Sequence, residues 1–571
     1  YETERPNSLY DPSGSFQNIN RRYDIVYGDV MLDFNYNIRR FDIAATLGWT
    51  GRYENMNNMR VSTNGGLVTE NWFDLNASRY TASSTLQRME LLKTGYMGTL
   101  SLGWDNYLFL ELTGRQERSS TLKDQSFFYP SANLSFLFSN AFRMPAWWNH
   151  GKLRLSYGVV GNAPETYAAN IIYEQGSDNG FTWNYVPSSW GNANIRPEKK
   201  YEYEIGFESK FLNNRLGFDV SYYNNRVKDQ ILSTPQPSTS GVKYVLMNVG
   251  EVANEGWDIS VSATPVLTKN FRWDLTANYG IYRNKVVKLA DGVPYLEISN
   301  IGGGGAKIQA VEGRPMGDIY VQVPQMNENG EYLVSDKGLY MNQTELQRVG
   351  NINPDGVGGL FSSFSYKNIF LDFSIDFRIG GDVINEMYQY STASGLTPES
   401  LQFRDTEHGG LSYYYPGNNN ASGVPVQVDP SLGAGPNGET VYHDGVILPG
   451  VVASTGEKNT RIIPAGYYYN QTYNWGTQPE QLTYRHSVFD NSYVKLRELT
   501  IGYQFPEKLI SKLGMTRLSV SVFGRNLFYF YKALKNYDAE SSVGTSWASQ
   551  AVVGGSTTAT RNFGVSLRAS F

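Results

Sequence analysis

Two clusters of aromatic and amide side chains are the residues in this sequence best suited to binding a ligand. The stretch "GYYYNQTYNW" (466–475) sets aromatic rings among Asn470, Gln471 and Asn474. Flat aromatic faces beside hydrogen-bonding amides suit sugar rings or extended peptides. A second stretch, "NGFTWNYVPSSW" (179–190), has a similar composition. The candidate substrate-binding residues are Trp183, Tyr185, Trp190, Tyr467, Tyr468, Tyr469, Tyr473 and Trp475.

The same aromatic residues have structural alternatives. They can pack the loops that carry them, lie at a membrane interface, or contact a partner protein. Replacing the 467–475 cluster with serines and measuring substrate affinity separates these roles, because only direct contact requires the affinity to fall.

Catalytic and metal-binding groups are not indicated. The sequence contains no cysteine, which excludes thiolate metal sites and cysteine nucleophiles. It has no G-x-S-x-G motif and no Ser/His/Asp grouping that its spacing supports. Its four histidines, His150, His408, His443 and His486, lack the spacing of metal ligands. We therefore expect no catalytic residue, metal or cofactor.

Long, two-faced β-strands must position these loops. In "IFLDFSIDFRI" (369–379), apolar residues from Ile369 to Ile379 alternate with a second set that includes Asp372, Asp376 and Arg378. Such patterns hold for roughly 10 to 14 residues, whereas soluble strands average about 5 to 6. A membrane-spanning strand needs about 9 to 11. A soluble β-sandwich or β-helix is the alternative.

The pattern predicts fifteen strands with an uneven set of connections. Short links lie near Ile38, Asp105, 213–214 and Lys367, while the other connections are mostly long. Short turns at one end and long loops at the other are typical of outer-membrane β-barrels. The predicted strands are 22–37, 39–56, 93–104, 106–118, 127–139, 151–161, 199–211, 214–228, 254–265, 270–285, 356–366, 368–381, 490–505, 515–527 and 559–571. The long loops are 57–92, 162–198, 229–253, 286–355, 382–489 and 528–558.

Two local features refine this all-β prediction. In "YVKLRELTIGYQF" the apolar set changes phase between Leu496 and Leu499, which indicates either a β-bulge or the point where the strand leaves an apolar layer. Lumen-facing positions such as Asp258, Thr276, Asp372, Asp376 and Arg378 are polar, as a water-filled interior requires.

Composition excludes several other classes. Aromatic residues form 14% of the 571 residues, too many for a disordered chain. The mean hydropathy of −0.41 and the lack of a long apolar run exclude a bundle of membrane helices. A net charge of −5 argues against nucleic acid as a partner.

Several blocks give the chain a family resemblance. They include "LRLSYGVVGN" (153–162), "IRPEKKYEYEIGFE" (195–208), "NVGEVANEGWDISV" (248–261), "YVKLRELTIGYQFPEKLISKLG" (493–514), "VFGRNLFYF" (522–530) and "FGVSLRASF" (563–571). In this order and spacing they resemble the SusC/RagA-type TonB-dependent outer-membrane transporters.

The resemblance implies a transmembrane antiparallel β-barrel of about 22 strands. The fifteen predicted strands would then be the C-terminal portion of that barrel. Residues 1–571 are accordingly expected to form one barrel portion with long extracellular loops. The family's N-terminal plug, its TonB-engaging segment and the first strands are not found in the sequence.

The implied activity is active import of large nutrients, glycans or oligopeptides, across the outer membrane of a Gram-negative cell. The implied partners are TonB, reached through the missing N-terminal part, and a SusD-like surface lipoprotein. Outer-membrane lipid would surround the barrel, and the resemblance allows a dimer of SusCD-type pairs. Two alternatives remain: a barrel receptor or adhesin without transport, and a barrel hydrolase.

Overall fold

A computed structural model describes residues 1–8, 11–123, 126–178, 181–474, 483–555 and 559–571. The chain divides into two compact units. Unit 1 comprises Tyr1–Ser209, Ser221–Ala253 and Ala290–Val293. Unit 2 comprises Lys210–Val220, Asn254–Leu289 and Pro294–Phe571.

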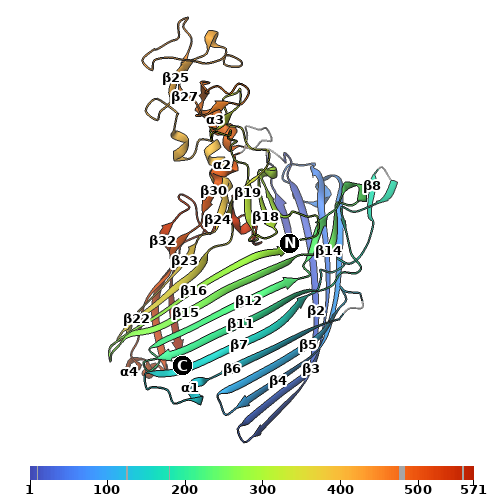
Figure 1. Cartoon of the computed structure of the whole chain (residues 1–571), viewed down its shortest axis with the longest axis vertical. Helices are drawn as coiled ribbons and strands as arrows, with labels where there is room; N and C mark the ends of the chain where they lie inside the picture. The colour runs from blue at the N-terminus through green and yellow to red at the C-terminus, as the bar shows by residue number, and fades with distance from the viewer. Residues whose placement is uncertain (9–10, 124–125, 179–180, 475–482, 556–558) are drawn as a thin grey trace. The chain divides into compact units, whose positions relative to one another are not determined.

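The long strands of unit 1 follow one another in chain order as antiparallel neighbours (Figure 1). The long strands are β2 (Ser15–Ile38), β3 (Phe41–Leu67), β4 (Ser78–Trp104), β5 (Leu108–Ser119), β6 (Ser126–Phe136), β7 (Trp148–Asn162) and β11 (Glu198–Phe211), and the short strand β1 (Glu2–Arg5) pairs with β2. Strand β12 (Leu216–Lys228) is divided between the two units, and the last two residues of β11 belong to unit 2.

Unit 2 continues the same kind of antiparallel meander. Its long strands are β15 (Glu251–Leu267), β16 (Phe271–Lys288), β22 (Gly356–Tyr366), β23 (Ile369–Ile379), β31 (Tyr493–Gln504), β32 (Arg517–Lys532) and β34 (Asn562–Ser570). Each of the fifteen predicted ranges overlaps one of the long strands of the chain, and the structure adds the short strand β1.

Each long strand has an apolar face and a polar face, as the alternation predicts. On β2 the apolar face presents Leu32 and Phe34, which are 72% and 58% exposed. On β34 it presents Phe563, Val565 and Leu567. Large apolar side chains remain this exposed over whole strands only where lipid replaces water. The strands are therefore built to stand between lipid and a polar interior.

The turns and the bulge confirm the predicted register. The β2–β3, β4–β5 and β22–β23 connections are tight turns, with positive φ at Arg39, Asp105 and Lys367. The pairing of β31 with β32 shifts register between Leu496 and Glu498, where the sequence breaks phase.

The predicted loop 57–92 is wrong over most of its length. Strand β3 runs to Leu67 and β4 begins at Ser78, so the connection is about ten residues. The predicted strands end where the alternation ends, but Asn57 and Asn58, which follow the predicted end at residue 56, continue the β3–β4 ladder. In the part of a strand that extends past the lipid layer, both faces meet water. The strand therefore continues there without an apolar face. The same effect extends β16 to Lys288 and β32 to Lys532.

The remaining long connections contain secondary structure of their own. Those of unit 1 hold α1 (Phe138–Ala141), β8 (Glu174–Asp178), β9 (Phe181–Tyr185), β10 (Ser189–Trp190), β13 (Ile231–Pro235) and β14 (Tyr244–Asn248). Those of unit 2 hold β17 (Tyr295–Ile301), β18 (Ala306–Val311), β19 (Asp318–Val321), β20 (Leu333–Val334), β21 (Gln347–Asn351), β24 (Asp382–Asn385), α2 (Glu386–Ala393), β25 (Leu411–Tyr414), β26 (Val426–Gln427), β27 (Val441–Val446), β28 (Val451–Val452), β29 (Ile463–Pro464), α3 (Ala465–Tyr473), β30 (Val488–Asp490), α4 (Glu507–Ile510) and β33 (Val552–Val553).

The connections of unit 2 have a buried core. Ile308, Ile319 and Val321 from the β17–β18–β19–β21 sheet pack with Ile384 of β24 and with Tyr484. Segments separated by almost 180 residues in the sequence thus share one apolar cluster, which makes these connections a folded body. Within the described residues, no helix has the length and hydropathy needed to span a membrane.

Candidate functional site

A pocket of about 410 Å³ opens on the polar face of unit 1, beside the short turns of β2–β3 and β4–β5. Cross-strand neighbours build it. Asp42 lies opposite Gly103, Glu111 opposite both Ser101 and Asn133, and Phe109 opposite Ser135. Because facing residues in a sheet share a side, one polar patch crosses five strands. The lining residues are Asn35, Asn37, Asp42, Ile43, Ala44, Ser101, Leu102, Gly103, Phe109, Leu110, Glu111, Asn133 and Ser135.

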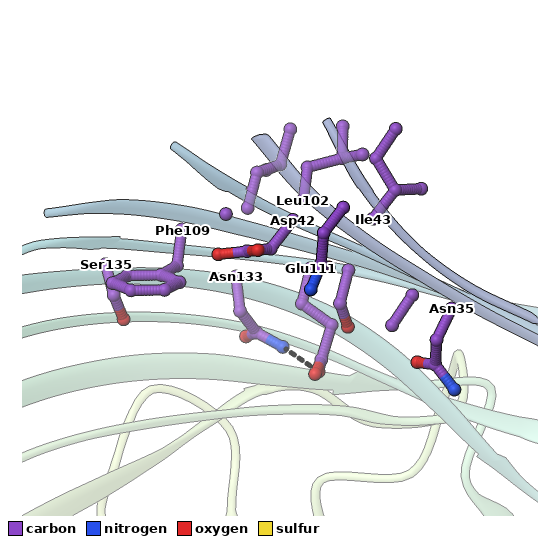
Figure 2. A pocket seen from close by; sticks show the side chains of 13 residues that line it. Asn35, Asp42, Ile43, Leu102, Phe109, Glu111, Asn133 and Ser135 are labelled. Atoms are coloured by element: carbon purple, nitrogen blue, oxygen red, sulfur yellow. Dashed lines mark hydrogen bonds between the residues drawn. The ribbon is translucent and has the colours of Figure 1, made fainter. Parts of the chain in front are cut away.

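The pocket offers hydrogen-bonding groups rather than a reactive centre. Figure 2 shows Glu111 and Asn133 on one side of the sheet and the side chains of Ile43 and Leu102 on the other. Asn133 Nδ2 donates to Glu111 Oε1 at 3.3 Å. Carboxylates, amides and hydroxyls around one aromatic ring can bind a hydroxylated or amide-bearing molecule. These residues were not singled out from the sequence, although their alternation with apolar residues could have indicated them.

The predicted residues Trp183, Tyr185 and Trp190 lie in unit 1 on or beside the β8–β9 hairpin. Trp183 and Tyr185 are 48% and 44% exposed. A Cβ at Gly176, opposite Trp183, would come within 2.7 Å of the indole, so glycine leaves the room that this ring fills. A hydrogen bond to Glu174 raises the pKa of Tyr185. The hairpin therefore holds Trp183 with much of its surface open to solvent.

Trp190 is placed differently from the other two. It is half-buried and packs edge-on against Tyr173, with ring centroids 5.9 Å apart. Trp183 and Tyr185 therefore keep the exposure that substrate contact requires, whereas Trp190 also has a packing role.

The second predicted cluster is an α-helix in unit 2. Tyr467, Tyr468, Tyr469 and Tyr473 all lie on α3, and Trp475 lies outside the described residues. Tyr469 and Tyr473 are only 4% and 8% exposed.

Buried contacts surround these two rings. Tyr469 donates from its hydroxyl to the carbonyl of Glu399 at 2.8 Å. Tyr473 packs against Tyr388 of α2 and against His486, with ring centroids 6.2 and 5.5 Å away. The packing alternative therefore accounts for Tyr469 and Tyr473.

Burial also changes the titration of this helix. It raises the pKa of Tyr468 and of Tyr473. Burial lowers the pKa of His486, and the neighbouring Arg485 lowers it further. His486 still keeps an exposed surface, and its neutral ring lies against Tyr473 on the solvent side of the helix contact. Tyr467 and Tyr468 are half-buried, and their substrate contact stays a prediction.

A charged cluster on the polar face of unit 2 fixes one long connection; we call it the Glu540 cluster. Glu540 accepts from Lys495 and from Arg497, whose Nη1 lies 2.9 Å away. Arg497 also binds Asp376 of β23. The Lys495 side chain is only 3% exposed and lies 4.7 Å from the Tyr529 ring. The cluster joins β23 and β31 to the connection between β32 and β34.

Further hydrogen bonds hold the same connection. Asn491 Nδ2 donates to the carbonyl of Ala539 at 3.0 Å. The Asp538 carboxylate accepts from the Tyr529 hydroxyl at 2.5 Å and from the Ala559 amide at 3.0 Å. Residues 538–540 are therefore attached on several sides. Among the described residues, no group of three or more His, Asp or Glu side chains could hold a metal ion.

Comparisons with known proteins place this architecture. The family model described as "TonB dependent receptor-like, beta-barrel" matches residues 1–318. The chain is 22% identical over 494 residues to "TonB-dependent receptor P3" of Formosa agariphila, an alignment covering 78% of this chain and 42% of that protein. It is 27% identical over 256 residues to "TonB-dependent receptor SusC" of Bacteroides thetaiotaomicron, covering 39% and 24%.

A solved structure has the same fold. The structure titled "Structure of the RagAB peptide transporter" superposes with a TM-score of 0.72 at 18% identity, covering 99% of this chain and 57% of that one. This chain thus spans about half the length of the proteins that it matches, or less. The family match covers more than half of the chain and agrees with its two-faced strands. The chain belongs to the TonB-dependent receptor family, and its long antiparallel strands are those of an outer-membrane β-barrel.

Proposed function

We propose that this chain is the barrel part of an active importer of large nutrients, glycans or oligopeptides, across the outer membrane. TonB energises the importer, and a SusD-like surface lipoprotein delivers the cargo. The observation that carries the proposal is the polar wall. Asp42, Glu111 and Asn133 line a pocket on the face of the strands turned away from lipid. An adhesin needs only its loops, whereas a transporter needs such a wall along its passage.

Family membership narrows the alternatives. The relatives are receptors and transporters, so the barrel is not an enzyme. One similar structure is a peptide transporter by its title, and one relative is named SusC. These names support nutrient import and a SusD-like partner. The 22-stranded total, the plug and the extracellular placement of the long connections are part of the same proposal.

Deleting the gene tests import directly. We expect the deletion strain to lose uptake of one class of labelled oligosaccharide or oligopeptide, with recovery on complementation. An uncoupler that collapses the proton gradient should stop uptake in the complemented strain, because the TonB system depends on it. Normal uptake of every oligosaccharide and peptide tested, together with lost adhesion, would favour the adhesin alternative instead.

The exposed hairpin aromatics give a second expected result. Replacing Trp183 with Ala should weaken binding of the cargo identified by the uptake assay about fivefold, since an aromatic contact contributes about 1 kcal/mol. Trp72, also exposed in unit 1 but outside the hairpin, provides the matched control Trp72→Ala. Calorimetric titration of both variants measures the affinities. Equal affinities would remove Trp183 from the site and leave it a surface residue.

A further inference from the structure

The N-terminal part of β4, before Lys93, has a neighbouring strand on one side only. Strand β3 pairs with it continuously from Ser84 to Trp104. On the other side β5 ends at Ser119, which lies opposite Lys93. Within the described residues, the stretch from Ser84 to Arg88 therefore forms a free sheet edge in unit 1. Figure 1 shows β4 among the long blue strands.

Hydrogen bonds just below this stretch show which backbone groups face outward. Leu92 accepts from the Ser120 amide at 2.9 Å and donates to Ser120 Oγ at 3.0 Å. The Glu90 amide donates to the Tyr167 hydroxyl at 3.1 Å. Every second residue of a strand points its N–H and C=O to the same side. Because the β3–β4 register is unbroken here, Ser84, Leu86 and Arg88 present three N–H and three C=O groups to the free side.

The residues of this edge include none of the types that usually prevent a further strand from pairing. The residues from Ser83 to Arg88 are all exposed, and none is a proline or a lysine. Natural proteins usually protect long edges with proline, lysine, bulges or a covering loop. The Tyr167 hydroxyl covers the edge at Glu90, where it takes the position of a neighbouring strand's acceptor. From Arg88 back to Ser84, the edge is open.

Unpaired cations flank the open edge on both faces of the sheet. Arg88 lies on one face, and Arg60, opposite Thr85, lies on the other. Arg21 shares the face of Arg60. In the described part of the chain these three arginines have no carboxylate partner, unlike the pairs Arg22–Asp24 and Arg52–Glu54. A strand added here would meet positive charge whichever face its side chains take.

We propose that the β4 edge from Ser84 to Arg88 binds an extended, carboxylate-bearing segment of a protein partner as an added β-strand. Main-chain hydrogen bonds supply the binding, as in other strand-addition sites, and the arginines select acidic segments. The edge is open rather than enclosed in a groove, so a free peptide would bear the full cost of being ordered. If the segment belongs to a partner protein that already binds this chain through other contacts, the entropic cost of ordering the segment is smaller. The inference does not depend on any imported cargo.

Photo-crosslinking on cells tests the proposal. A photoreactive residue at Thr85 of the full protein should crosslink to an acidic segment of a surface protein, mapped by mass spectrometry. Leu86→Pro should reduce the crosslink at least tenfold. Its ring removes the outward N–H and blocks the approach of a strand, while the bonds to β3 stay. Leu86→Ala, which keeps the N–H, should crosslink normally. Arg88→Gln should weaken the crosslink severalfold at low salt.

A synthetic probe checks the chemistry independently of folding. An acetylated heptapeptide of alternating threonine and glutamate should compete with the crosslink in the unmodified protein. The same peptide methylated on alternate backbone nitrogens should not compete, because it cannot complete the ladder. Equal competition by both peptides would overturn the proposal. So would an undiminished crosslink in a Leu86→Pro protein with normal surface levels, a crosslink to free peptides or glycans only, or no polypeptide crosslink at all.

Discussion

Replacing Glu540 with Ala should lower the free energy of opening of residues 533–555, in the connection between β32 and β34, by about 3 kcal/mol. The substitution leaves Lys495, 3% exposed, without its carboxylate, and an uncompensated buried charge costs about 3 to 5 kcal/mol. Arg497 would keep Asp376 but lose two of its bonds. Native-state hydrogen exchange of amides in this connection measures the opening free energy directly.

The matched control lies on the same strand. Glu498→Ala removes an ion pair with Arg525. The Glu498 and Arg525 side chains are 37% and 56% exposed. Exposed pairs contribute less than about 1 kcal/mol, so exchange in the connection should hardly change. If Glu540→Ala and Glu498→Ala behave alike, Glu540 does not anchor the connection.

Acid provides a second check on the same cluster. Burial opposes ionisation of Glu540, but hydrogen bonds from Arg497 and Lys495 outweigh it and hold its pKa below the usual value. A carboxylate with a depressed folded pKa contributes stability above its unfolded pKa of about 4.3 and loses it as pH falls through the folded pKa. Opening should thus increase below about pH 4. Asp538, whose pKa is also lowered, adds to this response, so the difference between the parent protein and Glu540→Gln isolates Glu540.

The long strands were predictable because the two environments of a membrane-spanning strand determine which residue types can occupy its two faces. Lipid on one side and water on the other require alternation, and residues from Ile369 to Ile379 show it with Phe370 as the single exception. Where the constraint ends the signal ends too. Asn57 and Asn58 belong to β3 although nothing in their order indicates a strand. Their strand conformation comes from pairing with β4, a tertiary contact that local sequence does not record.

The candidate site was predictable only in part. Trp183 and Tyr185 were chosen by residue type, and the structure shows that they are exposed, while their contact with cargo stays a prediction. Helix α3 was not predicted, because a run of tyrosines favours strand. The spacing of its buried residues Ala465, Tyr469 and Tyr473 at i, i+4 and i+8 is the signal that could have indicated a helix. The Glu540 cluster was hidden for a different reason. Its charges come from residues 376, 495, 497 and 540, which only the strand order of the sheet brings together.

Helix α3 gives the other large expected effect. Replacing Tyr473 with Ala should lower the opening free energy of α2 and α3 by about 3 to 5 kcal/mol, the usual loss for a buried aromatic residue. Its ring fills the space between Tyr388, Tyr469 and His486. Hydrogen exchange of the two helices measures the change. Exposed Asn470 on the same helix provides the control Asn470→Ala, which should leave the exchange unaltered.

A conservative variant separates this packing role from substrate contact. Tyr473→Phe keeps the ring and removes the hydroxyl. If the ring serves packing, this variant should lower the opening free energy of α2 and α3 only slightly. Tyr469→Phe should lose about 1 kcal/mol, because its hydroxyl donates to the Glu399 carbonyl. If Tyr473 instead contacts cargo, Tyr473→Ala would weaken cargo binding while exchange in α2 and α3 stayed normal. The burial of Tyr473 argues for the first outcome, because a ring that is 8% exposed has little surface left to offer.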